Sequence, residues 1–286
     1  MKRYEGRDRM KNDPFLRQEE RYYLIKQKPF DESPGLTAGM TSRLGGAGTA
    51  PYDTLNVAFH VEDNIETVLE NRGRIAESIG FSLSDWVAAE QVHGADIVKV
   101  DQHDKGKGAW NKEQSIGNFD GMYTLEKDVL LASFYADCVP LLFYAANHEC
   151  VGVAHAGWKG TSADIGGALV KKWRDVEGIN PKNIYAAIGP SISKSVYEVD
   201  NFVIRQMEHV LPKGQTPPWT PSKPNHWLLD LKEMNRILLN KAGIPLSNIF
   251  KSAHCTYKES DMFFSHRRSD GATGRMMAFI GIRGKC

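Results

Sequence analysis

The sequence has little that would connect it with export or with a membrane. Its four cysteines are irregularly spaced among 286 residues and include no C-x-x-C pair, so no disulfide framework is expected. The N-terminal residues mix charges of both signs and lack the apolar run of a signal peptide. No later run reaches the length that a membrane-spanning helix needs. These absences predict a protein of the reducing cytoplasm.

An excess of charge of one sign is also missing. Lysine and arginine total 36 against 35 aspartate and glutamate residues, which gives a formal net charge of +1. Such a balance provides no global field that would attract nucleic acid or an acidic membrane surface. Any anion-binding site must therefore be local. Hydrophobic residues make up 41% of the chain, which is enough for a packed core.

The order of patterns predicts a mixed α/β protein. We expect a flexible N-terminal extension over residues 1–20, because this stretch is polar, and a single catalytic domain over 21–286. Helices are predicted from Asp63 to Gly80, from Thr161 through Trp173, and from Asp230 to Gly243. Residues 212–226 are predicted to form a surface loop. Strands are predicted at 97–100, 129–135, 139–145, 150–155, 184–188, 249–253, 262–265 and 276–282.

Three residues at the ends of apolar runs carry the chemical signal of the sequence. His93, Cys138 and His155 each lie where a strand-like segment meets a turn marked by glycine or proline. They are too far apart in sequence for a local zinc finger, so only the tertiary fold could bring them together. Two imidazoles and one thiolate suit zinc, and three protein ligands leave a position open for chemistry. Gln91 and Asp137, next to these residues, are candidates for hydrogen bonds that orient the imidazoles.

Seven short motifs in this order resemble the multifunctional purine nucleoside phosphorylase family, formerly labelled polyphenol oxidase or laccase-domain. The resemblance extends from about residue 41 to residue 282 and leaves only the N-terminal extension uncovered. The motifs are Thr-Ser-Arg-Leu-Gly-Gly (41–46), Gln-Val-His-Gly (91–94), Asp-Gly-Met-Tyr-Thr (120–124), Ala-Asp-Cys-Val-Pro (136–140), His-Ala-Gly-Trp-Lys-Gly-Thr (155–161), Ile-Gly-Pro-Ser-Ile (188–192) and Arg-Arg-Ser-Asp-Gly-Ala-Thr-Gly-Arg (267–275).

The resemblance implies both a fold and an activity. The fold is a single-domain, four-layer α/β/β/α sandwich with mixed sheets. The implied cofactor is Zn²⁺, held by His93, Cys138 and His155, which are also the implied catalytic residues. The implied reactions are phosphorolysis of adenosine, inosine and methylthioadenosine, and deamination of adenosine to inosine. The expected partners are therefore purine nucleosides and inorganic phosphate. The resemblance does not rank these activities, and the sequence does not specify an oligomeric state.

Two further residues are predicted to bind substrate or phosphate. Arg43 is flanked by Gly45 and Gly46, whose backbone N–H groups are unobstructed, so it is the best local anion holder in the sequence. His60 follows the same loop and is a candidate proton donor or nucleoside contact. Arg267, Arg268 and Arg275 form a late basic cluster that could close on a phosphate. Adjacent side chains on a strand point to opposite faces, so at most one of the adjacent pair would enter a given cleft, and surface charge is the favoured interpretation.

Other interpretations of the same residues stay open from the sequence. A metal-free cysteine hydrolase or amidase would use Cys138 as nucleophile and His155 as base. A non-catalytic zinc-binding module would close its site with a fourth ligand such as His60. Copper fits less well than zinc, because multinuclear copper sites need many imidazoles, commonly in His-x-His pairs. The chain has nine histidines and no such pair.

Overall fold

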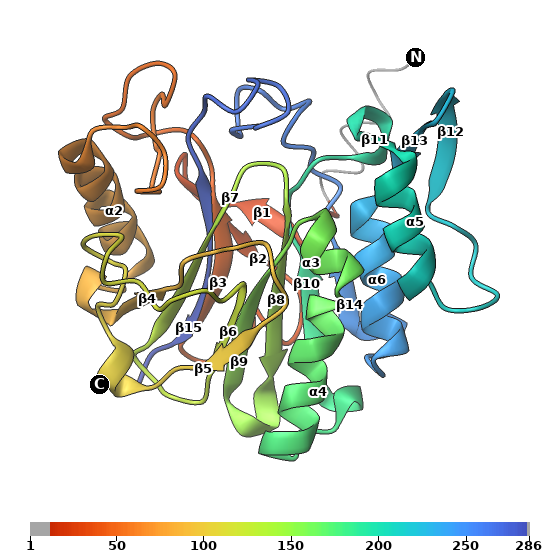
Figure 1. Cartoon of the computed structure of the whole chain (residues 1–286). Helices are drawn as coiled ribbons and strands as arrows, with labels where there is room; N and C mark the ends of the chain where they lie inside the picture. Colours follow the sequence, from red (N-terminus) through yellow and green to blue (C-terminus); the bar gives the residue numbers. More distant parts are fainter. Residues whose placement is uncertain (1–11, 285–286) are drawn as a thin grey trace.

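The apolar runs of the chain form the strands of two six-stranded mixed sheets (Figure 1). The computed structural model describes residues 12–284. The first sheet has the order β1 (Phe15–Arg17), β2 (Tyr22–Ile25), β3 (Leu36–Thr41), β15 (Met276–Ile282), β7 (Leu130–Tyr135), β4 (Trp86–Ala88). The second has the order β14 (Ile249–Lys251), β10 (Tyr185–Ile188), β8 (Val139–Ala145), β9 (Cys150–Ala156), β6 (Gly121–Thr124), β5 (Ile97–Lys99).

The main core lies between these two sheets. Every residue of β7, β8 and β9 is buried, as expected for strands that are apolar throughout and covered on both faces. One continuous cluster of buried side chains joins Tyr135 of the first sheet to Leu142 and Val153 of the second. The central strands are therefore held firmly at the ends where the candidate ligands lie.

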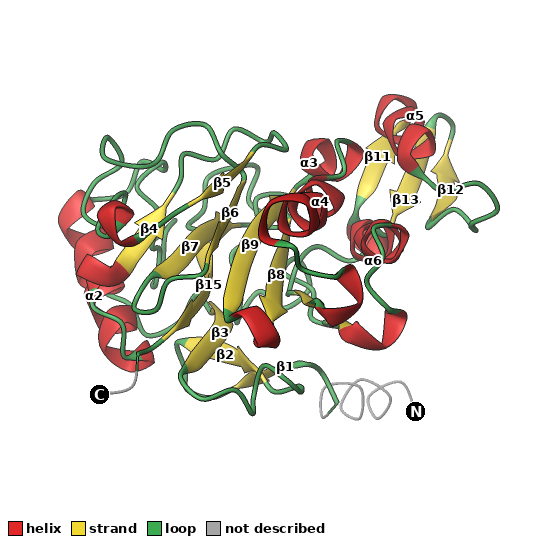
Figure 2. Cartoon of the chain, turned by 90° about the horizontal axis from the view of Figure 1, so that it is seen from below, coloured by secondary structure: helices red, strands yellow, loops and turns green. Residues whose placement is uncertain are grey.

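Helices cover the outer faces of both sheets (Figure 2). Helix α2 (Ile65–Ile79) packs on the first sheet through Ile75 and Ile79. Helices α4 (Ile165–Glu177) and α6 (Leu231–Lys241) pack on the second sheet through side chains such as Trp173. Two shorter helices, α3 (Trp158–Ser162) and α5 (Asn201–Val210), lie beside them. The mixed α/β class and the single domain predicted from the sequence are confirmed.

Several element boundaries differ from the predictions. The helix predicted from Thr161 is divided in two, because Asp164 adopts a left-handed conformation with φ of 54° and caps α4. Residues 262–265 form no strand and instead run as a buried loop. In helix α2 the cap is Asn64 rather than Asp63, since its side chain accepts from the N–H of Thr67.

Part of the predicted N-terminal extension forms a strand. Residues 1–11 lie outside the described part of the chain, but β1 lies inside the predicted extension and pairs with β2. Phe15 is fully buried in the core between the sheets. The prediction of a flexible segment over 1–20 is therefore wrong for residues 15–17, where one buried aromatic ring outweighs the polar composition around it.

The predicted loop at 212–226 contains part of a third sheet. Strand β12 (Trp219–Lys223) pairs with β13 (His226–Leu229), which in turn pairs with β11 (Glu198–Asp200). This small sheet was not predicted, because β12 has four exposed residues out of five and shows no apolar run. None of the described helices is long and apolar enough to cross a bilayer. Within residues 12–284 there are also six single-turn 3-10 segments: Leu83–Asp85, Gln102–Asp104, Ala146–His148, Pro181–Asn183, Lys194–Val196 and Leu246–Asn248.

Candidate metal centre

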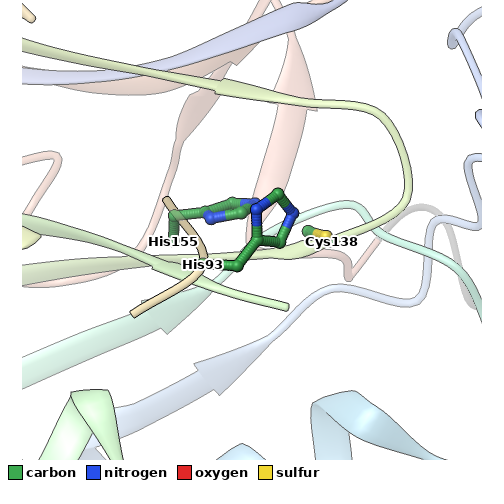
Figure 3. A group of neighbouring side chains, drawn as sticks. All are labelled: His93, Cys138 and His155. Atoms are coloured by element: carbon green, nitrogen blue, oxygen red, sulfur yellow. The ribbon is translucent and has the colours of Figure 1, made fainter. Parts of the chain in front are cut away.

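The fold brings three donor groups from separate segments to one place (Figure 3). His93 lies in the loop between β4 and β5, Cys138 in the turn between β7 and β8, and His155 on β9. One nitrogen from each imidazole and the sulfur atom all lie within 4.8 Å of one another. The two imidazole rings are nearly perpendicular, with centroids 4.8 Å apart. This group could hold a metal ion.

A single carboxylate, that of Asp120, positions two of these donors. Its Oδ1 lies 2.8 Å from Nδ1 of His155, which leaves Nε2 of that ring for a metal. Its Oδ2 accepts hydrogen bonds from the backbone N–H groups of Val92 and Gly94, on either side of His93. The loop that carries His93 is thereby fixed to the strand that carries His155, although neither Gln91 nor Asp137 makes this contact.

Asp137 does not hydrogen-bond to the imidazoles; its hydrogen bonds fix the turn before Cys138. Its φ is 86°, a left-handed conformation that is strained for a residue other than glycine. Its carboxylate accepts hydrogen bonds from the hydroxyls of Thr256 and Ser265 and from the backbone N–H of Arg267. These bonds hold the turn so that the thiol of the next residue faces the imidazoles.

The donor group also needs a glycine beside it. A Cβ atom placed on Gly157 would lie 3.0 Å from the sulfur of Cys138 and 3.4 Å from a ring carbon of His93. The first glycine in the motif that begins at His155 therefore has a steric reason, because the backbone approaches the donors closely there.

The charges of the donors stabilise one another. Burial alone would raise the pKa of the Cys138 thiol, but the charge of His155 and hydrogen bonds from His155 and His93 lower it to about 6. Burial alone would lower the pKa of His155, but the thiolate of Cys138 and the carboxylate of Asp120 raise it to about 9. At pH 7 the sulfur is therefore a thiolate, which is the form that binds metals.

The donors open into a cavity of about 450 Å³. Such a volume lies within the range of pockets that bind small organic molecules. Its wall combines aromatic rings with basic side chains, and the lining residues include Phe59, His60, Arg72, Glu90, Lys112, Phe134, Trp158, Tyr197, Arg267 and Arg275. Arg267 and Arg275 both belong to the late basic cluster, so its interpretation as surface charge is wrong for these two residues. The turns of residues 266–275 place both side chains at the same cavity.

The two predicted substrate residues lie in different places. His60 lines the cavity, where desolvation and the charges of Arg275 and Lys112 lower its pKa to about 4 and keep the ring neutral at pH 7. Arg43 is not among the lining residues. Its guanidinium donates to the backbone oxygens of Asp53 and Ser260 and forms an ion pair of 3.0 Å with the Asp53 carboxylate.

Two of the site residues that sequence reasoning missed are Asp120 and Arg72. Asp120 opens one of the seven motifs, at the start of a strand, but a single carboxylate there gave no separate signal. Arg72 gave a clearer signal in the sequence. It lies four residues after Val68 and three before Ile75, on the buried face of α2, and a cation at such a position calls for an explanation.

Known proteins resemble this chain over most of its length. A sequence model of the family described as "Multi-copper polyphenol oxidoreductase laccase" matches residues 37–283. The chain is 47% identical over 249 residues to "Purine nucleoside phosphorylase YlmD" of Geobacillus stearothermophilus, with 87% of this chain and 91% of the relative covered. It is 45% identical over 246 residues to the Bacillus subtilis protein of the same name, with 86% and 88% covered.

Solved structures agree with this relationship. The crystal structure of YlmD from Geobacillus stearothermophilus superposes with a TM-score of 0.93 at 44% identity, covering 95% of this chain and all of the other. The crystal structure of the Bacillus licheniformis hypothetical protein YfiH gives 0.91 at 40% identity, covering 94% and 99%. The chain therefore belongs to the laccase-like family whose curated relatives are named purine nucleoside phosphorylases.

Proposed function

We propose that this protein is a zinc-dependent purine nucleoside enzyme. Its reactions are the phosphorolysis of adenosine, inosine and methylthioadenosine to the free base and a ribose 1-phosphate or methylthioribose 1-phosphate, and the deamination of adenosine to inosine. The phosphorylase activity is supported by the names of relatives that are 47%, 45% and 35% identical to this chain. The cytoplasm is the proposed compartment, and it agrees with the free thiols of Cys138, Cys150 and Cys255.

The observation that carries the proposal is the incomplete donor set at the cavity wall. His93, Cys138 and His155 form a group of three, and within residues 12–284 neither His60 nor an acidic residue joins it as a fourth ligand. Three protein ligands are typical of catalytic zinc sites, whereas structural sites normally have four. The donors also line a cavity large enough for a nucleoside. This arrangement favours an enzyme over a closed, purely structural site.

The residues present fit a zinc ion. Cys138 offers a thiolate, and the contact between Asp120 and Nδ1 of His155 directs Nε2 of that ring toward the ion. Because the pKa of His155 is raised, Nε2 must give up its proton when the metal binds. When bound, zinc would supply Lewis acidity, which lowers the pKa of a coordinated water to about 7. Copper is the less favoured metal, because the group has only two imidazoles and so does not resemble a multinuclear copper site.

The two reactions place different demands on the cavity. In phosphorolysis a phosphate oxygen bonds to the anomeric carbon, the bond from that carbon to the purine nitrogen breaks, and its electron pair leaves with the base, which takes up a proton. In deamination water adds to the purine carbon that bears the amino group, and ammonia leaves. The aromatic rings of Phe134, Trp158 and Tyr197 offer surfaces on which a purine can stack. The neutral ring of His60 is suited to hydrogen-bond a nucleoside hydroxyl.

One incubation tests both activities. Metal-analysed protein is incubated with adenosine, with and without inorganic phosphate, and the products are separated by chromatography. Release of adenine only in the presence of phosphate is the expected result for phosphorolysis. Formation of inosine without phosphate is the expected result for deamination. The absence of both products would contradict the nucleoside assignment.

A metal-free cysteine hydrolase is the second candidate, and one observation favours it. The opposite pKa shifts of Cys138 and His155 describe a thiolate beside an imidazolium, which is the resting state of many cysteine nucleophiles. Chelation separates the two candidates. A zinc enzyme loses its activity to a chelator and regains it when zinc is returned, whereas a thiol hydrolase is unaffected by the chelator but is inactivated by alkylation.

A further inference from the structure

The most unusual charge in the described part of the chain is that of Arg72. Its residue is 1% exposed, and burial lowers the pKa of its guanidinium to about 9, with no acidic group acting in the other direction. A buried cation without a carboxylate partner is costly, because its lost hydration is not replaced by an opposite charge. Ionisable groups whose pKa is strongly shifted by desolvation cluster at functional sites.

The protein holds this guanidinium in place without neutralising it. Nε donates to the carbonyl of Val57, and Nη1 donates to the carbonyls of Gly108 and Ala109. These bonds leave Nη2 for another partner. The ring of Phe59 lies 3.9 Å from the central carbon of the guanidinium and that of Phe134 lies 4.8 Å from it, so cation–π attraction offsets part of the desolvation. Arg72 is therefore rigid, charged and available at the cavity wall.

A second guanidinium without a carboxylate partner lies at the same wall. Arg275 donates from Nη1 to the carbonyls of Thr273 and Gly274. Its backbone N–H is bound by the side chain of Asn56, next to the residue whose carbonyl holds Arg72. Both arginines are thus fixed to one short segment, which continues to His60, and the charges of both lower the pKa of that histidine.

The other basic groups nearby are already paired or lie in another loop. Lys112 forms an ion pair of 3.3 Å with Glu90, and Arg43 forms one with Asp53 outside the cavity. Arg267 stacks over the ring of Tyr197 and donates to the carbonyl of Glu198. Arg72 and Arg275 therefore give the cavity two positive charges, and both act on the neutral imidazole of His60.

We propose that Arg72 and Arg275 form the inorganic phosphate subsite of this cavity. Guanidinium groups bind phosphate oxygens through paired, charge-assisted hydrogen bonds. Two such groups match the charge of the phosphate dianion, and the uncompensated burial of Arg72 is relieved when the anion binds. The subsite rests on the proposed phosphorylase function, for which it supplies the nucleophile, and it assigns to Arg72 and Arg275 the role that the sequence predicted for Arg43.

Direct binding tests the subsite without reference to turnover. The affinity of the zinc-loaded protein for inorganic phosphate is measured by calorimetry for the wild type and for Arg275→Gln. We expect the dissociation constant to rise roughly 10–100-fold in the variant, the equivalent of losing a hydrogen bond to a charged group. Arg74→Gln is the matched control, because Arg74 lies on the same helix as Arg72 but pairs with Glu70 away from the cavity. The affinity of Arg74→Gln for phosphate should equal that of the wild type.

Two further variants complete the test. Arg72→Lys keeps the charge but loses the planar guanidinium whose paired donors match phosphate oxygens, so it should also weaken phosphate binding. Thermal unfolding checks the folding of Arg72→Lys, and if this variant does not fold, Arg275→Gln decides the matter. Arg43→Gln should bind phosphate normally. Unchanged affinity in Arg275→Gln, or a loss seen only in Arg43→Gln, would overturn the subsite.

Parallel titrations identify the source of the phosphoryl group. If the subsite serves inorganic phosphate, free phosphate binds in the absence of any nucleotide. If adenosine 5′-monophosphate binds through the two arginines and free phosphate does not, the subsite belongs to a nucleotide substrate and the proposal is wrong.

Failure of the subsite can be distinguished from failure of the proposed phosphorylase function. Phosphate binding that depends on Arg275 without any release of base supports the subsite and contradicts the phosphorylase. Phosphorolysis with an unchanged KM for phosphate in Arg275→Gln supports the phosphorylase and contradicts the subsite.

Discussion

At the scale of single residues, Asp120 decides where two of the three donors lie. One oxygen holds the ring of His155, and the other holds the backbone on both sides of His93. Burial alone would raise the pKa of this carboxyl, but the hydrogen bonds from His155 and Gly94 lower it, so it remains ionised and accepts on both sides.

Asp120→Asn tests this double role. An amide has only one acceptor oxygen, so it cannot accept from His155 and from the His93 loop at once. We expect zinc affinity to fall roughly 10–100-fold, as is usual when the partner of a metal-bound histidine is removed. Competition with a chromophoric chelator measures the change. Asp96→Asn, an exposed carboxylate in the same loop, is the control and should bind zinc normally. Equal affinity in both variants would show that the donors need no such support.

The residues that the sequence revealed and those that it hid differ in a physical way. His93, Cys138 and His155 are recognisable because their side-chain types suit a metal and each lies at the end of an apolar run. Arg43 attracted attention through its glycine neighbours, but an ion pair with Asp53 fixes it outside the cavity. That pairing depends on the path of the loop, which no local pattern specifies.

At the scale of elements, patterns located the strands that are long apolar runs more accurately than the short or mixed ones. Strands β8 and β15 have the predicted bounds, because an uninterrupted apolar run has few alternative interpretations when it is buried on both faces. Strands β1 to β4, β6 and β11 to β13 were missed, both at the edges of the sheets and inside them, because they are short or of mixed composition and owe their formation to their neighbours. The break before α4 was hidden too, since it depends on the conformation of Asp164.

Connections between elements also depend on charges, and Asp85 gives a prediction on pH. This carboxylate, in the 3-10 segment after α2, pairs with Lys105 at 2.9 Å and with Arg283 at 3.0 Å. Burial alone would raise its pKa, but the hydrogen bonds from Lys105 and Ser82 and the charges of Lys105 and Arg283 lower the pKa below its ordinary value. Because the folded-state pKa is depressed, the charged form stabilises the fold above the unfolded-state pKa of about 4, and this stabilisation is lost as the pH falls through the folded-state value.

We therefore expect Asp85→Asn to lower the free energy of unfolding at pH 7 by roughly 1–3 kcal/mol, the range for a lost hydrogen bond to a charged group. The difference from the wild type should shrink as the pH is lowered from about 5 to about 3, the range in which the carboxyl takes up its proton. Urea unfolding at each pH measures both effects. Asp96→Asn is again the control, since its exposed side chain should show little difference at any pH. If the difference in the free energy of unfolding between Asp85→Asn and the wild type stayed constant over the whole acid range, the carboxylate would contribute through its shape and not through its charge.

At the scale of the whole molecule, the site depends on the two sheets being held against each other. Cys138 follows a strand of the first sheet and precedes a strand of the second, while His155 lies within the second. The donors can therefore meet only if the core between the sheets is closed. The short strand β1 contributes to this closure through Phe15, which is fully buried in the same cluster as Tyr135 and Val153.

Phe15→Ala measures how far the N-terminal strand belongs to this core. We expect the free energy of unfolding to fall by about 3–5 kcal/mol, as for other fully buried aromatic side chains. Leu16→Ala is the matched control, since Leu16 is the next residue of β1 but is only half-buried, and it should cost less than half as much. Chemical unfolding followed by fluorescence gives both values. A loss below about 1 kcal/mol for Phe15→Ala would mean that the two sheets close without β1. Residues 15–17 would then contribute little to the free energy of unfolding, as expected for the extension predicted from composition. A side chain can be buried without the rest of the core depending on it.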